Sequence, residues 1–397
     1  MTKIRVCRTA SIPDPLRISR YQKIPELGPR ILFFSGGTAL TGLSRELKKF
    51  THNSIHFVSP FDSGGSSAKL RHAFDMPAIG DLRSRLMALA DETVLGHPEI
   101  YRLFSYRFSV TENQERLKRR LQNMVNGKDD LINDIANPMR KLICNHLGYF
   151  YQSMPKDFDL RGASIGNLIL AGGYLNNHKD LEPIVFLFSK LVHVLGTVRT
   201  ITNDDYHLSV ELENGEIIHG QHLITGKEVA PILSPIKHIH LSETLNGSRP
   251  TETKLRKRNR GLFEDADLIC YPPGSFYTSL LANLLPTGVG KAIANNGCPK
   301  VFVPNLNSDP EQLGMTLQDS LMTIIKYIQE DITGDAPANT VLNYLMVDTK
   351  NGQYPGGIPT DLLQELNIEL IDVKLIDKRH DKTYDNKRLV SALLSLT

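Results

Sequence analysis

Short apolar runs alternate with stretches of helical spacing near the start of the chain. The apolar runs occupy residues 30–34 (RILFF) and 54–60 (SIHFVSP), and each has the length of a buried strand. Between them, Leu43 and Leu47 lie four residues apart, as on one face of a helix over 41–50. This order predicts a β-α-β unit.

The same alternation of apolar runs and helical spacing occurs in the second half of the chain. The segment ADLICYPPGS at 266–275 joins an apolar strand to a turn of proline and glycine, FYTSLLANLL continues as a helix, and KVFVPN at 300–305 is the next strand. Strands that alternate with helices predict a mostly parallel sheet covered by helices. We therefore expect an α/β fold, a Rossmann-like three-layer sandwich over residues 30–397, preceded by an N-terminal extension over 1–29.

Two stretches depart from this alternation. Residues 197–226 alternate polar and β-branched side chains around the turn signal Asn214-Gly215, which predicts an antiparallel β excursion forming a small subdomain over about 197–240. Spaced leucines and isoleucines among many charges, including ERLKRRLQ, predict a helical insertion over about 109–160.

The charge balance limits the class of partner. Among 397 residues, 46 lysines and arginines stand against 43 aspartates and glutamates, so the chain lacks the basic excess that drives nucleic-acid binding. An anionic small molecule fits better. No stretch reaches the ~18–20 apolar residues of a membrane span, and the first thirty residues lack an apolar signal-peptide centre. We expect no nucleic-acid and no membrane partner.

The cysteines carry no metal or disulfide pattern. They are scattered along the chain without a CxxC pair: Cys7, Cys144, Cys270 and Cys298. This distribution indicates a reducing, cytoplasmic compartment. The arginine- and serine-rich start of the chain also allows an organellar transit peptide, although Pro13 and Pro15 interrupt a long amphipathic helix there.

The stretch SGGT at 35–38 lies between a predicted strand and a predicted helix. A glycine pair in this position lets backbone N–H groups approach a bound anion, and the helix start adds a partial positive charge. Gly36, Gly37 and Thr38 are therefore candidate phosphate ligands. A tight corner without a ligand is the alternative.

A second glycine-rich turn follows the next predicted strand. The sequence PFDSGGSSAKLR supplies Asp62, then Gly64, Gly65 and Ser66. Because ligands of open α/β sheets bind outside the carboxyl ends of strands, the two turns are expected to share one crevice. Asp62 lies at roughly the spacing of a ribose-binding acid in dinucleotide folds. Its alternative role is a helix N-cap.

Three more helix starts carry polar side chains. Arg83 and Arg85 follow Gly80-Asp81 in the first turn of a probable helix, where cations favour a nearby anion; solvated arginines are the alternative. The turn YPPGSFYTS crowds donors around a helix start. Asn167 heads a hydrophobic helix, as a cap or as a reader of base and ribose.

Six segments in this order resemble one superfamily: SGGTALTGLSREL, DSGGSSAKLR, IGDLRSRLMALAD, IGNLILA, YPPGSFYTSLLANLL and VFVPNL. The superfamily unites 2-phospho-L-lactate transferases (CofD) with gluconeogenesis factor proteins (YvcK), and the wording here is more similar to the second branch. The resemblance covers most of the chain from about Arg30 onward.

The resemblance implies a nucleoside diphosphate in the crevice. One branch transfers a phospholactyl-type group from a guanosine diphosphate donor to a deazaflavin hydroxyl with magnesium; the other binds UDP-sugars. It implies a transferase using a GDP- or UDP-type donor, or alternatively a non-catalytic UDP-sugar-binding regulator of carbon or cell-wall metabolism. A homodimer is possible.

The candidate residues combine the turns with the resemblance. Asp62 and Asp81 are the candidate catalytic residues, with Asp62 as magnesium ligand. The candidate nucleotide-binding residues are Gly36, Gly37, Thr38, Gly64, Gly65, Ser66, Arg83, Asn167, Gly274 and Ser275. Two positions depart from the family pattern: Ala39 replaces a glycine, and Ser63 replaces a second acid.

Two further features favour structural roles. His238 and His240 lie two apart on a predicted strand and point the same way, but without a visible third ligand such pairs are usually structural. The basic run KLRKRNR at 254–260 is either a ligand-covering segment or, as short charge runs mostly are, a solvated one.

Overall fold

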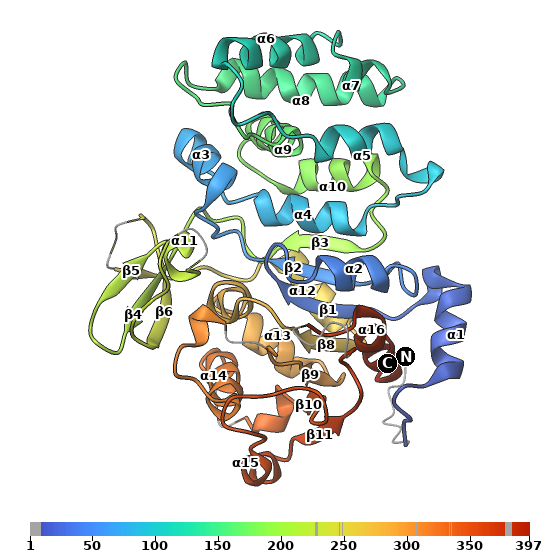
Figure 1. Cartoon of the computed structure of the whole chain (residues 1–397), viewed down its shortest axis with the longest axis vertical. Helices are drawn as coiled ribbons and strands as arrows, with labels where there is room; N and C mark the ends of the chain where they lie inside the picture. Colours follow the sequence, from blue (N-terminus) through green and yellow to red (C-terminus); the bar gives the residue numbers. More distant parts are fainter. Residues whose placement is uncertain are drawn as a thin grey trace.

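A parallel sheet of seven strands forms the centre of the protein in the computed structural model (Figure 1). The structure describes residues 9–226, 229–245, 247, 249–306, 309–332, 334, 336–377 and 383–397. The strands are β1 Ile31–Ser35, β2 Ile55–Val58, β3 Thr197–Thr200, β8 Leu268–Tyr271, β9 Lys300–Phe302, β10 Tyr344–Val347 and β11 Glu369–Asp372. Their order is β11-β10-β9-β8-β1-β2-β3, and all neighbours run parallel. The predicted α/β fold is confirmed.

The direction in which the sheet grows reverses at β1. The chain adds β2 and β3 on one side of β1, then returns to add β8 and its successors on the other side. Leu32 of β1 pairs with Ile55 of β2 and with Ile269 of β8. Such a reversal opens a crevice at the carboxyl ends of the strands, where ligands of open α/β sheets bind.

Alternate residues of β1 enter the two layers of the core. Ile31 and Phe33 pack with α2 (Thr41–Leu47) and α16 (Asn386–Ser395), and α1 (Pro15–Lys23) adds Ile18 to that cluster. Leu32 and Phe34 face the opposite layer, which contains α12 (Lys257–Glu264), α13 (Val289–Asn295), α14 (Leu317–Gln329) and α15 (Thr360–Glu365). Successive strand residues point to opposite faces, so the four apolar residues Ile31 to Phe34 serve two cores.

The predicted N-terminal extension packs against the end of the chain. Asp14 caps α1 by accepting a hydrogen bond from the N–H of Arg17, and its own N–H donates to Oγ of Ser395 at 2.8 Å. The described part of this extension therefore forms one packed layer with α16.

A helical unit with its own apolar core lies beyond the β3 edge of the sheet (Figure 1). Its helices are α3 Gly65–Phe74, α4 Gly80–Leu89, α5 Pro98–Ser105, α6 Gln114–Val125, α7 Asp130–Asn133, α8 Met139–Ser153, α9 Ile165–Asn176 and α10 Glu182–Leu191. The insertion predicted over 109–160 contains α6, α7 and α8. None of the helices in the described part of the chain combines the length and apolar character needed to cross a membrane.

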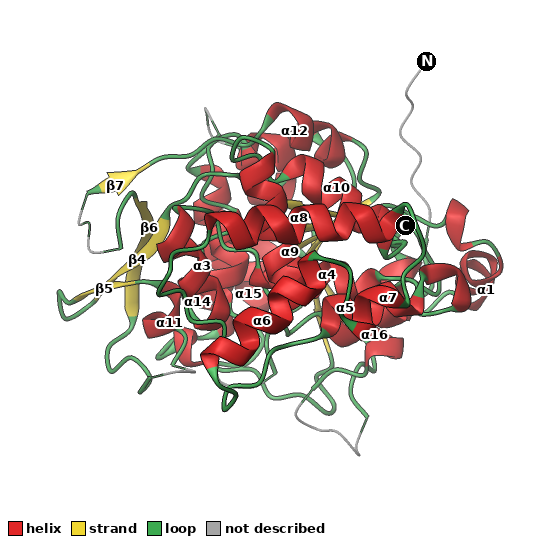
Figure 2. Cartoon of the chain, turned by 90° about the horizontal axis from the view of Figure 1, so that it is seen from above, coloured by secondary structure: helices red, strands yellow, loops and turns green. Residues whose placement is uncertain are grey.

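A small antiparallel sheet lies at one side of the molecule, opposite α1 (Figure 2). It consists of β4 (His207–Leu212), β5 (Ile217–His219), β6 (Ile236–Ser242) and β7 (Pro250–Thr251), with the short helix α11 (Gln221–Ile224) after β5. The Asn214-Gly215 turn joins β4 to β5, as predicted. The stretch 197–200, expected in this excursion, instead forms β3 and pairs with β2 in parallel.

The described cysteines Cys144, Cys270 and Cys298 are free thiols. Burial raises the pKa of the Cys270 thiol, which keeps it protonated and inert. Cys7 lies outside the described residues.

Close packing of α8 on α9 generates a prediction at Gly172. A Cβ atom there would lie 1.9 Å from the carbonyl oxygen of His146. We expect Gly172→Ala to lower the free energy of unfolding by ~1–3 kcal/mol, because backbone must move to admit the methyl group. Urea denaturation measures the change.

A matched helix glycine provides the control. A Cβ at Gly148 in α8 would lie 3.6 Å from Val125, an ordinary contact. Gly148→Ala should therefore leave the protein as stable as the parent or stabilise it by up to ~1 kcal/mol. Equal effects at the two glycines would contradict the close packing described here.

Candidate functional site

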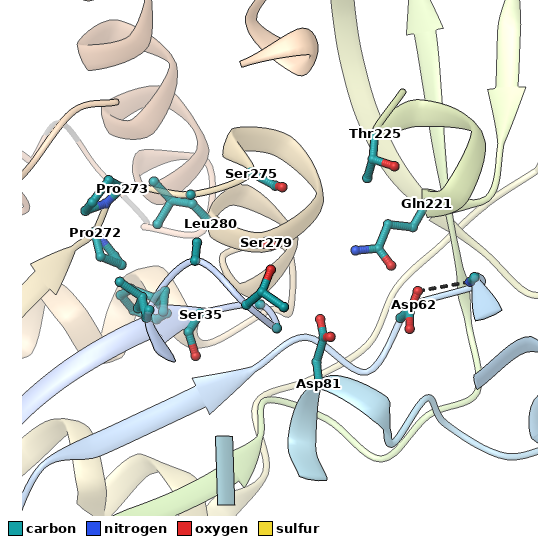
Figure 3. Close-up of a pocket in the computed structure, with 18 of the residues that line it drawn as sticks. Ser35, Asp62, Asp81, Gln221, Thr225, Pro272, Pro273, Ser275, Ser279 and Leu280 are labelled. Atoms are coloured by element: carbon teal, nitrogen blue, oxygen red, sulfur yellow. Dashed lines mark hydrogen bonds between the residues drawn. The ribbon is translucent and has the colours of Figure 1, made fainter. Parts of the chain in front are cut away.

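A polar pocket of about 180 Å³ opens at the carboxyl ends of β1, β2 and β8, where the sheet reverses (Figure 3). It is formed by the loop after β1, the turn after β2, the first turn of α4, the helix α11 and the turn after β8. The lining residues are Phe34, Ser35, Gly36, Gly37, Thr38, Ala39, Leu40, Asp62, Gly64, Asp81, Gln221, His222, Thr225, Pro272, Pro273, Gly274, Ser275, Ser279 and Leu280.

The first glycine turn is held from below by a buried arginine. Arg85, which is fully buried, donates from Nη2 to the carbonyl oxygens of Gly36 at 3.1 Å and Gly37 at 3.2 Å. Its Nη1 donates to Oγ of Ser44. Burial lowers the pKa of Arg85 to about 10, and Asp81 opposes this fall, so the guanidinium remains charged at neutral pH. Arg85 therefore supports the turn and does not line the pocket.

In the turn after β1, the carbonyls of Gly36 and Gly37 point to Arg85. Within the described part of the chain, the backbone N–H groups of Gly37, Thr38 and Ala39 donate none of the backbone–backbone hydrogen bonds outside helices and strands. Successive N–H groups that no backbone carbonyl engages are a feature of the concave surfaces that bind anions in proteins. The turn after β1 thus has the geometry that a phosphate site requires.

Pocket side chains lie so close to the turn after β1 that only glycine fits at positions 36 and 37 without displacing them. A Cβ on Gly36 would lie 2.1 Å from Oγ of Ser279, and a Cβ on Gly37 would lie 2.2 Å from Oδ1 of Asp81. A larger residue at either position would displace a pocket side chain. The Asp81 carboxylate therefore lies directly against the turn.

Two carboxylates enter the pocket from neighbouring elements. Asp62 follows β2, and Asp81 stands in the first turn of α4; Figure 3 shows both side chains projecting to the same side. Oδ1 of Asp62 accepts the N–H of Gly64 at 3.0 Å, where α3 begins. Asp62 therefore caps the approach to α3 with one oxygen while it also lines the pocket.

Basic side chains near the second turn point away from the pocket. Lys69 pairs with Asp159 at 2.8 Å. Arg71 pairs with Asp205 at 2.7 Å and donates to the carbonyl of Asp62. No lysine or arginine belongs to the described lining, and the charge of the buried Arg85 reaches Asp81 from below the turn.

The turn after β8 differs from its predicted role. We expected its helix start to offer donors to a phosphate, but Phe276 N–H donates to Asp309 at 2.8 Å, and Tyr277 and Thr278 N–H donate to Oε2 of Glu311 at 2.8 Å. The Gly274 N–H donates to Asn305. Carboxylates of the protein thus occupy this helix start, although Gly274 and Ser275 still line the pocket.

Four predicted site residues lie outside the pocket lining: Gly65, Ser66, Arg83 and Asn167. Nδ2 of the buried Asn167 donates to Oγ of Ser66 at 3.1 Å. Oδ1 of Asn167 and Nε of Arg83 are buried without a partner among the described residues. Burial, followed by the charge of Arg107, lowers the pKa of Arg83 to about 10. The structure joins Asn167 to Ser66 away from the lining.

The antiparallel sheet supplies a wall that sequence reasoning missed. Gln221, His222 and Thr225 line the pocket from α11 and its end. Ser63, which departs from the family pattern, lies 2.8 Å from Nδ1 of His222 through its Oγ. No local motif marks these residues, because the turn between β5 and β6 that carries them is recognisable only once the two sheets are placed together.

The histidine pair and the basic run have structural partners. His238 and His240 stack at 6.1 Å, and the Tyr327 hydroxyl lies 3.1 Å from Nδ1 of His238. The described residues contain no group of three histidine, cysteine or acidic side chains that could hold a metal ion. In the basic run, Arg256 and Arg258 pair with Glu182.

The buried carboxyl of Glu311 generates a prediction about pH. Burial raises its pKa from 4.5 to about 7, and Asp309 adds to the rise, against three hydrogen bonds that lower it. Between these values the folded protein binds more protons than the unfolded chain, so the free energy of unfolding should fall as pH rises through this interval. The slope attributable to Glu311 is at most ~1.4 kcal/mol per pH unit.

Glu311→Gln should remove this slope and keep the fold. The amide oxygen still accepts the two backbone N–H groups, and the amide nitrogen donates to Thr278. Denaturation at pH 4.5 to 7 compares it with the parent and with Glu365→Gln, a change at an exposed carboxylate. A parental slope in the Glu311→Gln protein would assign the pH dependence elsewhere.

The sequence matches that of a described protein family along most of its length. The match is to the family described as 2-phospho-L-lactate transferase CofD, over residues 31–376. The gluconeogenesis factor of Bacillus subtilis is 26% identical over 380 residues, which cover 93% of this chain and 98% of that protein. The gluconeogenesis factor of Halalkalibacterium halodurans is 30% identical over 308 residues, 77% of this chain and 76% of that protein.

The fold has a counterpart among solved structures. The crystal structure of a UPF0052 family member from Bacillus halodurans matches with a TM-score of 0.67 and 25% identity, over 92% of this chain and 99% of that one. The resemblance inferred from the ordered motifs is confirmed. The chain is a member of the 2-phospho-L-lactate transferase CofD family.

Proposed function

We propose that this protein binds a nucleoside-diphosphate-linked small molecule in the pocket after β1 and transfers its phospho-linked group to a hydroxyl acceptor. The observation that carries the proposal is the Gly36–Thr38 turn. The carbonyls of Gly36 and Gly37 are fixed by buried Arg85, and the turn lines the pocket at the point where the sheet reverses. Phosphate oxygens are the ligands that such a turn suits.

The lining suits magnesium beside the phosphates. Asp62 and Asp81 supply carboxylate oxygens, and Oε1 of Gln221 is buried without a partner among the described residues. Magnesium prefers oxygen ligands and is commonly held by one or two carboxylates together with substrate phosphates. When bound, it neutralises charge on the phosphates. Because two carboxylates stand in the described lining and would repel a phosphate, ligand binding should depend on the cation.

The chain's own residues would position the reactants. The turn at Gly36–Thr38 holds the diphosphate, and a pocket carboxylate accepts the proton of the acceptor hydroxyl. The hydroxyl oxygen forms a bond to the distal phosphorus, the bridging P–O bond breaks, and nucleoside monophosphate leaves with that electron pair. Positioning and electrostatic stabilisation provide most of the acceleration in such transfers.

A second candidate is a non-catalytic nucleotide-sugar sensor. The relatives from Bacillus subtilis and Halalkalibacterium halodurans are named gluconeogenesis factors, which favours a regulatory role. One incubation separates the two functions. Purified protein is mixed with a GDP- or UDP-linked donor, a deazaflavin acceptor and magnesium, and nucleoside monophosphate is measured by chromatography. Release that requires acceptor and magnesium supports transfer; tight binding without release supports the sensor.

Binding should depend on the close approach at Gly37. Gly37→Ala places a methyl group against the Asp81 carboxylate. We expect GDP or UDP affinity, measured by calorimetry with magnesium, to fall by about tenfold or more, which corresponds to the loss of one or two phosphate contacts. Gly261→Ala is the control, since a Cβ there meets nothing within 4 Å. If a folded Gly37→Ala protein bound the nucleotide as tightly as the parent, the turn would have no role in ligand binding.

The magnesium dependence of nucleotide binding should require the charge of Asp62. Asp62→Asn keeps the shape and the acceptor for the Gly64 N–H but removes the charge. We expect the ratio of nucleotide affinities with magnesium and with chelator to fall towards one. Asp129→Asn provides the control, because Oδ1 of Asp129 also accepts an N–H two residues on, from Leu131, outside the pocket. A parental ratio in Asp62→Asn would remove the metal role from this residue.

A further inference from the structure

The pocket wall formed by α11 belongs to the antiparallel sheet. Gln221, His222 and Thr225 stand between β5 and β6, whereas the rest of the lining comes from loops of the parallel sheet and α4. Figure 3 shows the amide of Gln221 reaching into the pocket opposite Ser279. This wall therefore faces the glycine turn across the cavity and is available to a ligand that the turn holds.

Ser63 is the hydrogen-bond partner of His222. Oγ of Ser63 accepts the backbone N–H of His222 at 3.3 Å and lies 2.8 Å from its Nδ1. The hydroxyl has one proton and no other acceptor among the described residues. When that proton bonds to Nδ1, Nε2 carries the hydrogen of the neutral ring and is a donor.

The position of the ring leaves the Nε2 edge for the pocket. A Cβ built on Gly220 would lie 3.1 Å from both Nδ1 and Cε1 of His222, so that edge is covered by backbone and by Ser63. His222 is nevertheless a lining residue. The opposite edge, formed by Cδ2 and Nε2, is the one that remains for a ligand.

We propose that Nε2–H of His222 donates a hydrogen bond to a phosphate oxygen of the bound ligand, and that Ser63 is the positioning residue that fixes this tautomer. The inference rests on the proposed function, because the ligand is the diphosphate held by the glycine turn. His222 adds a ring N–H donor to a described lining that contains no lysine or arginine. Ligand binding then joins the antiparallel sheet to the parallel one through a phosphate.

The chain contains a matched pair for the test. Ser209 and His219, on β4 and β5, also meet through Oγ and Nδ1 at 2.8 Å, but neither lines the pocket. His222→Phe keeps a ring and the backbone N–H to Ser63 while it removes the donor. His222→Gln restores an N–H donor near the position of Nε2. His219→Phe is the control for loss of a histidine from the same sheet.

Calorimetry with GDP, UDP and their parent nucleosides, in magnesium, measures the contribution of His222. We expect His222→Phe to weaken diphosphate binding by about tenfold to a hundredfold, the range for a hydrogen bond to a charged group. Nucleoside binding should not change. His222→Gln should recover part of the loss, and His219→Phe should bind like the parent.

Two outcomes would overturn the inference in different ways. If the parent binds the diphosphates and His222→Phe binds them equally well, His222 is no phosphate ligand and the proposed function stands. If the parent binds none of them, the proposed function and this inference fail together. Thermal unfolding of each variant confirms that a loss of affinity is not a loss of fold.

Ser63 is tested by a readout that packing alone would not move. Nitrogen-15 NMR of the ligand-free protein should show His222 protonated at Nε2, and Ser63→Ala should shift the ring towards a mixture of tautomers. The same variant should weaken diphosphate binding several-fold through a larger dissociation constant. A ring protonated at Nδ1 in the parent would overturn the proposed donor.

Discussion

The candidate site depends on one buried charge. Arg85 lies in the interior with no exposed surface, and an unpaired buried guanidinium would cost several kcal/mol. Its hydrogen bonds to Ser44 and to the carbonyls of Gly36 and Gly37 offset that cost, and they fix the first turn before any ligand arrives. The same charge, after burial, lowers the pKa of the neighbouring His56, which stacks on Phe33 as a neutral ring. One buried side chain, Arg85, thus both supports the glycine turn and influences the charge state of a histidine in the core.

Carboxylates stand at three of the helix starts around the pocket, although α2 and α11 begin without one. Asp62 precedes α3, Asp81 lies in the first turn of α4, and Glu311 accepts the N–H groups after β8. Each satisfies the positive end of a helix, where acids are favourable. The helix starts of α3, α4 and the turn after β8 therefore already hold acids of the protein. The acids that fill the helix starts also create the negative charge for which a divalent cation would compensate.

The sequence predicted the parts whose signals are local. Alternation of apolar runs and helical spacing predicted β1, β2, β8 and the parallel sheet, because a buried strand needs a continuous apolar run. Asn214-Gly215 predicted the hairpin of β4 and β5. The pattern at 197–200 suggested antiparallel pairing, but strand direction is set by the partner, and β2 is the partner there. An edge strand with half-exposed residues carries no mark of its direction.

The site was predictable where glycines or acids follow strands, as at Gly36 and Asp62, and unpredictable where a contact joins distant segments. Arg85 was expected near an anion because of its charge, yet it binds backbone carbonyls 48 and 49 residues away. Glu311 lies 33 residues from Thr278, whose N–H it accepts, and Ser63 lies 159 residues from His222. Such contacts follow from topology, which no local spacing encodes.

The place of α11 has an evolutionary consequence. The antiparallel sheet leaves the main fold after β3 and rejoins it before β8, so its turns can lengthen, shorten or change sequence while the parallel sheet keeps its pairing. One wall of the pocket is carried on that excursion. Proteins that share this parallel sheet could therefore differ in the shape of the pocket through changes confined to the antiparallel sheet.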